Sequence, residues 1–199
     1  DPYADALAPR LPQGESVYHR AMMYKGDLYV FTDFNMNITF VEKAFATHPD
    51  AKRVFVICHF PVLPCGKQTP DWIVLGRPNH ERNQTARAKL RELLLSRNAI
   101  VLSGHTHTSN FMRFSDEKGR SFTQIGLFSE TTLPPAKDVT VEVVDPTKYF
   151  ESVKHWLKDF PGYPNREAVV AEYIPGIKEF IRYTPAISSG KLEINDDGS

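Results

Sequence analysis

This chain of 199 residues has few cysteines and a formal net charge of zero. Its 2 cysteines, Cys58 and Cys65, are too few for a disulfide framework, and without histidines at finger spacing they do not predict a structural zinc site. Whether they form one local bridge stays open. Lysine and arginine number 24, as do aspartate and glutamate, so the charge balance predicts no capture of nucleic acid. No apolar run is long enough to span a bilayer.

A 41% hydrophobic fraction is enough for a packed core, and the length suits one domain with an appendage. We expect residues 1–16 to be a lead-in loop and residues 17–145 to form an α/β unit. Hydrophobic periodicity and turn residues predict its elements. The expected strands are 17–24, 28–34, 53–58, 99–103, 110–114, 121–127 and 139–144, and the expected helices are 39–47 and 84–97. Alternating strands and helices followed by a β-meander predict a mixed sheet in a layered α/β sandwich.

The character of the sequence changes after Asp145-Pro146. Residues 147–160 and 166–182 carry aromatic side chains at helical spacing, with prolines between the two stretches. We therefore expect residues 146–199 to form a helical C-terminal appendage. Packing against the core or a second subunit is its default role, and a cap over a substrate cleft is the more specific alternative.

Two of the expected strands end in histidine. The run 54–58 leads into His59, and the run 99–103 leads through Gly104 into His105 and His107. Strand carboxyl ends display functional groups in α/β proteins, and neutral imidazole is a common metal ligand. Two histidines spaced by one residue can lie on the same side of an extended segment. The sequence therefore predicts that His59, His105 and His107 converge on metal, although any one of them alone is more often an ordinary hydrogen-bonded residue.

The segment 61–83 is rich in proline and has no clear period, so we expect a loop at the mouth of the site. Trp72, Arg77 and His80 are its candidate substrate-binding residues, and the forked donors of arginine suit phosphate. The alternative for these residues is that Trp72 pins the loop to the core while the other two are solvated.

The order of these blocks resembles the calcineurin-like metallophosphoesterases. The resemblance rests on the strand ending in His59-Phe60-Pro61, the helix 84–97, and the strand ending in Gly104-His105-Thr106-His107. It implies that His59 and His105 ligate one ion and His107 a second, in a centre of two divalent metal ions (Fe, Zn or Mn). It also implies hydrolysis of a phosphate ester by metal-activated water, and the sandwich fold of that family.

The first three blocks of that family are absent here: Asp-x-His, Gly-Asp-x-x-Asp and Gly-Asn-His-Asp or Glu. By the resemblance they supply a bridging aspartate, further ligands and the general acid. Uncharged imidazoles alone cannot offset the repulsion between two cations. We therefore expect this chain to be the C-terminal half of such a domain, to bind at most one ion weakly, and to be inactive without the missing N-terminal half.

Three functional classes stay open from the sequence. They are a metallophosphoesterase whose N-terminal half lies elsewhere, a catalytically inactive binding or scaffolding module of the same fold, and a protein with a single zinc on three histidines. We favour the first. The triplets 37–39 and 83–85 match the N-glycosylation pattern and favour an extracytoplasmic location only slightly, because such triplets arise readily by chance.

Overall fold

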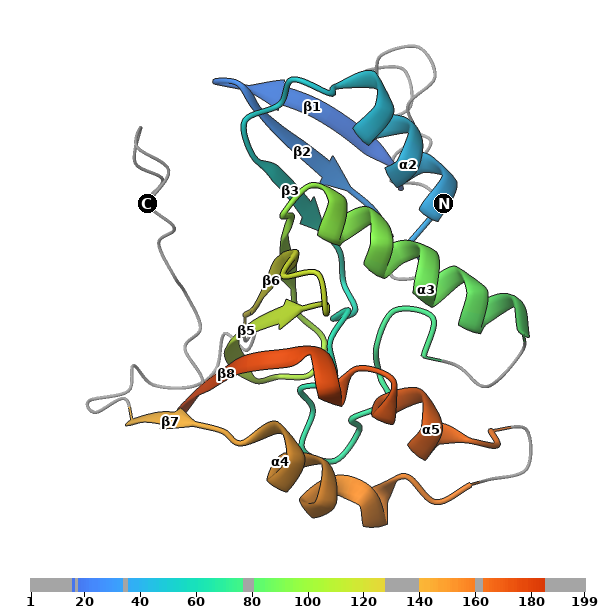
Figure 1. The fold of residues 1–199 in the computed structure, drawn as a ribbon, viewed down its shortest axis with the longest axis vertical. Coiled ribbons are helices and arrows are strands. Elements are labelled where there is room, and N and C mark those ends of the chain that lie inside the picture. The colour runs from blue at the N-terminus through green and yellow to red at the C-terminus, as the bar shows by residue number, and fades with distance from the viewer. Residues whose placement is uncertain are drawn as a thin grey trace, which may run out of the picture.

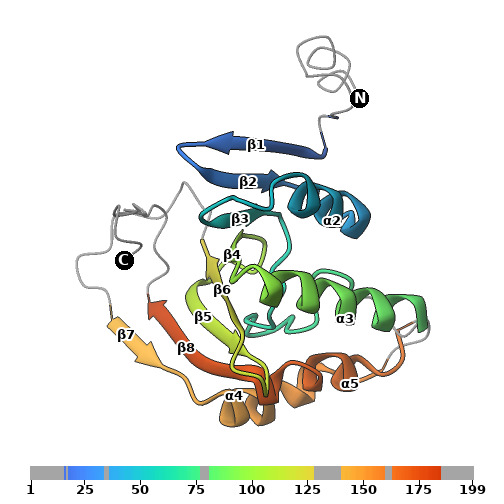
Figure 2. The same ribbon diagram turned by 45° about the horizontal axis from the view of Figure 1, so that its top comes forward.

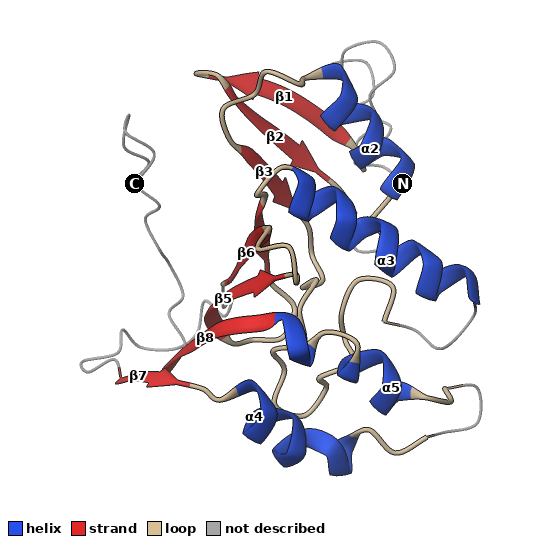
Figure 3. Ribbon diagram, viewed as in Figure 1, coloured by secondary structure: helices blue, strands red, loops and turns tan. Residues whose placement is uncertain are grey.

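The computed structural model of the chain describes residues 16, 18–33, 36–76, 81–127, 140–159 and 163–184. Within these residues the chain forms one mixed sheet of eight strands and four α-helices (Figures 1 and 3). The α/β class and the mixed sheet expected from the sequence are confirmed.

Strands and helices alternate between residues 27 and 103, and a β-hairpin of residues 109–126 follows. The next strand, residues 140–143, does not pair with the strand before it, and helices separate it from the last strand, so the β-meander expected from the sequence is wrong. The strands are β1 (Arg20–Tyr24), β2 (Asp27–Phe31), β3 (Val54–Ile57), β4 (Ile100–Ser103), β5 (Ser109–Ser115), β6 (Ser121–Gly126), β7 (Thr140–Val143) and β8 (Ile177–Thr184). The helices are α2 (Ile38–Thr47), α3 (Glu81–Ser96), α4 (Pro146–Val153) and α5 (Arg166–Ala171), with the 3-10 turns η2 (Lys154–Trp156) and η3 (Ile174–Gly176).

The strands are ordered β1-β2-β3-β4-β6-β5-β8-β7 across the sheet. The neighbours β2, β3, β4 and β6 are parallel, while β1, β5 and β7 run against their neighbours. Helices α2 and α3 lie side by side on one face, and α4 and α5 lie at the β7–β8 end of the sheet (Figure 2). Because β3 and β4 are parallel neighbours, their carboxyl ends lie next to each other at one edge of the sheet.

Local turn chemistry explains the two predicted elements nearest the N-terminus. Lys25 and Gly26 both have positive φ (50° and 86°), as a two-residue type I′ turn requires, and join β1 to β2 in a hairpin. Asn37 caps α2, because its side-chain oxygen accepts a hydrogen bond of 3.1 Å from the backbone N–H of Phe40. The two strands and the helix that the sequence predicted here are confirmed.

The two faces of the sheet differ in burial. On the helix-covered face a row of side chains at matching register is almost fully buried: Val30, Val56, Val101, Gln124, Met112 and Phe180. On the opposite face the next positions form a second row, which we call the apolar row: Phe31, Ile57, Leu102, Ile125, Phe111, Ile181 and Val143. Every member of the apolar row is partly or largely exposed, and Val143 is 81% exposed.

The C-terminal segment departs from the sequence prediction. Residues 166–171 are helical as expected, but the helix predicted to run to Arg182 is wrong for Ile177–Thr184, which form β8 between β5 and β7. The first predicted helix, 147–160, ends at Val153 and continues as a 3-10 turn to Trp156. The segment expected to be a helical appendage thus contributes a strand to the interior of the sheet. None of the helices in the described part of the chain is long and apolar enough to cross a membrane.

Candidate metal centre

Backbone pairing between β3 and β4 continues beyond both strands and fixes the first two histidines. The N–H of Cys58 donates to the carbonyl of Leu102 (3.0 Å), and the N–H of Gly104 donates to the carbonyl of His59 (3.1 Å). His59 and His105 therefore leave the sheet from adjacent, hydrogen-bonded strand ends.

The two imidazoles meet. Nδ1 of His105 lies 2.8 Å from Nε2 of His59, and the ring centroids are 4.7 Å apart with the planes at 68°. One nitrogen of this contact must donate and the other accept, so at least one of the contacting nitrogens is unprotonated. The other ring nitrogen of His105, Nε2, is buried and has no hydrogen-bond partner among the described residues.

Aromatic rings enclose His105. The ring centroid of Phe60 lies 4.1 Å from that of His105, and the ring centroid of Trp72 lies 4.9 Å from it. Burial, together with the nearby His59 and His107, lowers the pKa of His105 below its usual value. The His105 ring is therefore largely uncharged at neutral pH, which is the form that binds metal.

The third predicted ligand, His107, is close enough to His105 to contribute to the lowered pKa of that ring. Its side chain is exposed, and among the described residues no group of three histidine, cysteine, aspartate or glutamate side chains is placed to hold a metal ion. The segment is bent rather than extended: His105 and His107 have φ of 67° and 50°, whereas Gly104 does not have a positive φ. Left-handed backbone at residues other than glycine costs roughly 1–2 kcal/mol each. The backbone is therefore not extended at His105 and His107. The side-chain alternation of a strand, on which the sequence prediction relied, does not apply to these two residues.

Contacts behind the Gly104–His107 segment hold its backbone. The hydroxyl of Thr106 lies 3.0 Å from that of Thr108 and 3.4 Å from Sγ of Cys65. Cys58 and Cys65 are both buried and free, so the local disulfide left open by the sequence is not formed. Burial raises the pKa of the Cys58 thiol to about 12, so this thiol stays protonated beside His59 at neutral pH.

Of the three predicted substrate-binding residues, only Trp72 falls within the described part of the chain. Its side chain is 48% exposed while its ring contacts His105, so it can reach both the histidines and a bound molecule. Arg77 and His80 lie outside the described residues. The segment from Pro61 to Gly76 has no helix or strand, in agreement with the predicted loop.

Side chains that the sequence analysis did not single out hold the loop 58–76, which carries Trp72. The buried Gln124 accepts hydrogen bonds from the N–H groups of Val62 and Leu63, both at 2.7 Å. The sequence did hold a signal for this role of Gln124. It is a polar residue at a position of β6 where strand alternation directs the side chain into the core.

Three further residues that the sequence analysis did not single out fix the rest of the loop from distant segments. Arg166 binds both carboxylate oxygens of Asp71 at 2.8 Å, Tyr149 donates to the carbonyl of Gly66 at 2.9 Å, and Arg87 donates to the carbonyl of Leu75 at 3.0 Å. For these contacts the sequence holds no signal, because each partner lies on another element.

No protein-family model matches the chain, and a search of curated proteins finds no match. Assignment of a function therefore depends on the residues of this site and on the sheet that positions them.

Proposed function

We propose that this chain supplies the histidine part of a metal centre in a hydrolase of phosphate esters. The observation that carries the proposal is the 2.8 Å contact between Nδ1 of His105 and Nε2 of His59 at two paired strand ends. It is supported by the resemblance of the two histidine blocks to the metallophosphoesterases. On the same resemblance, we propose that the complete domain has the metallophosphoesterase sandwich fold, binds two divalent ions and acts on a phosphate ester.

The donor set and its spacing fit a divalent ion. Two nitrogens on one ion, each bound at about 2.0–2.1 Å and at an angle near 90–110°, lie roughly 2.9–3.4 Å apart. The observed separation of 2.8 Å is just below that range, so the rings need little movement to share an ion. A bound divalent ion would polarise a phosphate oxygen and lower the pKa of water. The residues of this chain would contribute neutral nitrogen donors, and Trp72 and Phe60 would keep bulk water from His105.

The charge balance at the site supports an incomplete centre. The nearest acid on the loop, Asp71, has both oxygens engaged by Arg166 and is not available as a ligand. Neutral imidazoles provide no negative charge to hold two cations together. We propose that the bridging carboxylate and the general acid come from an N-terminal half, as the resemblance implies.

The apolar row supports the same inference from packing. A sheet buries both faces in a layered fold, and the helices in the described part of the chain cover one of them (Figure 2). Seven apolar positions in register across the other face provide the surface that a second layer would bury. We propose that the missing half of the domain packs on this face.

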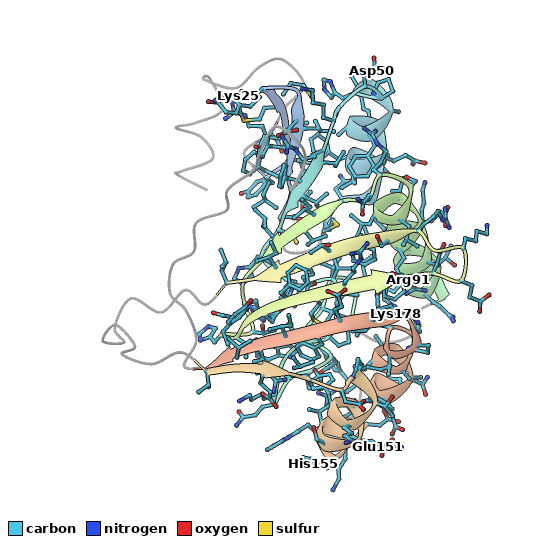
Figure 4. All side chains as sticks on the ribbon, turned by 60° about the vertical axis from the view of Figure 1, so that its left-hand side comes forward. Lys25, Asp50, Arg91, Glu151, His155 and Lys178 are labelled. Carbon is cyan, nitrogen blue, oxygen red and sulfur yellow. The ribbon has the colours of Figure 1, made fainter. Side chains whose placement is uncertain are left out.

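Metal titration of wild-type protein and of His59→Ala and His105→Ala tests the ligand assignment. The matched control is His155→Ala, because His155 lies at the α4 end of the molecule, opposite Lys25 (Figure 4). We expect both site variants to lose zinc or manganese binding and the control to retain it.

An aryl-phosphate assay on this chain and on one extended at the N-terminus separates the functional classes. Activity only in the extended chain supports the hydrolase. Metal-free, inactive extended protein would support the binding module instead, and tight stoichiometric zinc on this chain alone would support the single-zinc protein.

A further inference from the structure

The backbone at His105 forms a strained turn. The N–H of Thr106 donates to the carbonyl of Gly104 at 2.8 Å, and His105, the residue between them, has a φ of 67°. This is the pattern of the γ-turn with a positive φ at its central residue, which is rare and strained. Such a backbone persists only where the surrounding contacts hold it. The direction in which the His105 ring leaves the backbone therefore depends on those contacts.

Asn110, on β5, contacts the end of this segment from inside the fold. It is 2% exposed, and its amide nitrogen Nδ2 donates to the carbonyl of Thr108 at 3.1 Å. The hydroxyl of Thr108 in turn lies 3.0 Å from that of Thr106. A continuous set of polar contacts thus runs from the Asn110 side chain to the residue that closes the turn at His105.

Gly126 leaves the space that this amide occupies. The two residues pair across β5 and β6, and a Cβ atom on residue 126 would lie 2.3 Å from Nδ2 of Asn110. Ordinary van der Waals contact needs about 3.5–4.0 Å. Any side chain at position 126 would therefore push the amide away from the carbonyl of Thr108.

The other end of the amide is not satisfied. Oδ1 of Asn110 is buried and has no hydrogen-bond partner among the described residues. A buried acceptor without a partner costs stability, and an apolar side chain of similar shape at position 110 would avoid that cost. Stability therefore does not account for an amide at this position, whereas its contact with the histidine segment does.

We infer that Asn110 is a positioning residue for the candidate metal centre. Seated on Gly126, it fixes the turn that carries His105, so that Nδ1 of His105 meets Nε2 of His59. It acts through the backbone of residues 104–108 and not as a ligand. The consequence for metal binding rests on the proposed function, whereas the placement of the two rings without metal does not.

The test compares Asn110→Leu with Met112→Leu in the full chain. Leucine has nearly the shape of asparagine but cannot donate a hydrogen bond. Met112 is the next buried residue on the same face of β5, so its volume-conserving replacement is the matched control. The first readout is NMR of the ring nitrogens of His59 and His105 and of the Thr106 amide, recorded without metal. The second is zinc affinity, measured by competition with a chelating dye.

We expect Asn110→Leu to melt close to the wild type, because the lost hydrogen bond is offset by removal of the unsatisfied oxygen. It should nevertheless shift the ring and amide signals. It should also weaken zinc binding by about tenfold or more, as loss of a group that orients a ligand does. Met112→Leu should leave both the signals and the zinc affinity at their wild-type values.

Gly126→Ala moves the same amide without removing it, and it decides the question if Asn110→Leu does not fold. It should reproduce the shifted signals and the weaker zinc binding. In an Asn110→Ala background it should have no further effect, because no amide is left to displace.

Ring and amide signals at wild-type positions in Asn110→Leu or Gly126→Ala would overturn the inference, and so would equal shifts in Met112→Leu. Wild-type zinc affinity in a variant with shifted ring signals would overturn the link to the metal centre. If the wild type binds no zinc, the proposed function fails, and the ring signals still decide whether Asn110 positions His105.

Discussion

Arg166 and Asp71 form a buried, paired ion contact in which Nε and Nη2 of the arginine lie 2.8 Å from the two carboxylate oxygens. Arg166 begins α5, and Asp71 precedes Trp72 in the loop beside the histidines. This contact links the C-terminal segment to the candidate centre, so that segment helps to position the site.

We expect Arg166→Met to destabilise the chain by about 3–5 kcal/mol, because Asp71 would remain buried without its partner. The double variant Asp71→Leu/Arg166→Met should recover most of that loss. Urea unfolding measures both. A cost below about 1 kcal/mol for the single variant would show that the pair does not hold the loop.

Trp72 provides a local readout of the same contact. The chain has 2 tryptophans, so a Trp156→Phe background leaves the fluorescence of Trp72 alone. We expect Arg166→Met to shift that emission to the red and raise its quenching by iodide, because Trp72 would leave His105. Unchanged emission would contradict the positioning role of Arg166.

Gln124→Met should cost about 1–3 kcal/mol for each backbone N–H left unsatisfied, because Val62 and Leu63 would lose the acceptor for both of their N–H groups. The measurement is urea unfolding, combined with hydrogen exchange at these two amides. Gln84→Met on the exposed side of α3 is the matched control and should cost little. Protection of the Val62 and Leu63 amides that survives the Gln124 change would contradict this account.

Stability should also depend on pH through Glu172. Burial raises the pKa of this carboxyl, but hydrogen bonds and charge from Arg87 and Arg91 outweigh burial and bring the pKa below its usual value. Because the folded-state pKa is lowered, the stabilisation is complete above the unfolded value of about 4.3 and is lost as pH falls through the folded value.

A Glu172→Gln variant tests this dependence. It should be less stable than wild type at neutral pH, and the gap should narrow below a pH of about 4.3. The check is urea midpoints of both proteins across that range. A gap that stays constant with pH would show that ionised Glu172 does not supply the stabilisation.

Much of the fold could be predicted because its signals are local. The turn residues at Lys25-Gly26 and the apolar spacing of residues 39–47 and 84–97 are local features, and the strands and helices that they predict are present. The helix predicted to include residues 177–182 is wrong there, although Ile177, Phe180 and Ile181 match helical spacing. Pairing with β5 and β7, far away in the sequence, makes this segment an interior strand with apolar residues on both faces.

In the candidate site, too, some features could be predicted from the sequence and others could not. The meeting of His59 and His105 could be predicted because both end adjacent parallel strands. The left-handed backbone at His105 and His107, which bends the segment, has no local signal in these residue types. The loop contacts of Arg166 and Arg87 join elements that only the folded chain brings together.

Zinc and manganese titration of wild type, His59→Ala, His105→Ala and His155→Ala tests the central claim most directly. The wild-type chain should bind at most one ion weakly. Either site substitution should abolish that binding, whereas His155→Ala should leave it unchanged. Equal metal binding by wild type and both site variants would contradict the assignment of the His59–His105 pair as the metal ligands.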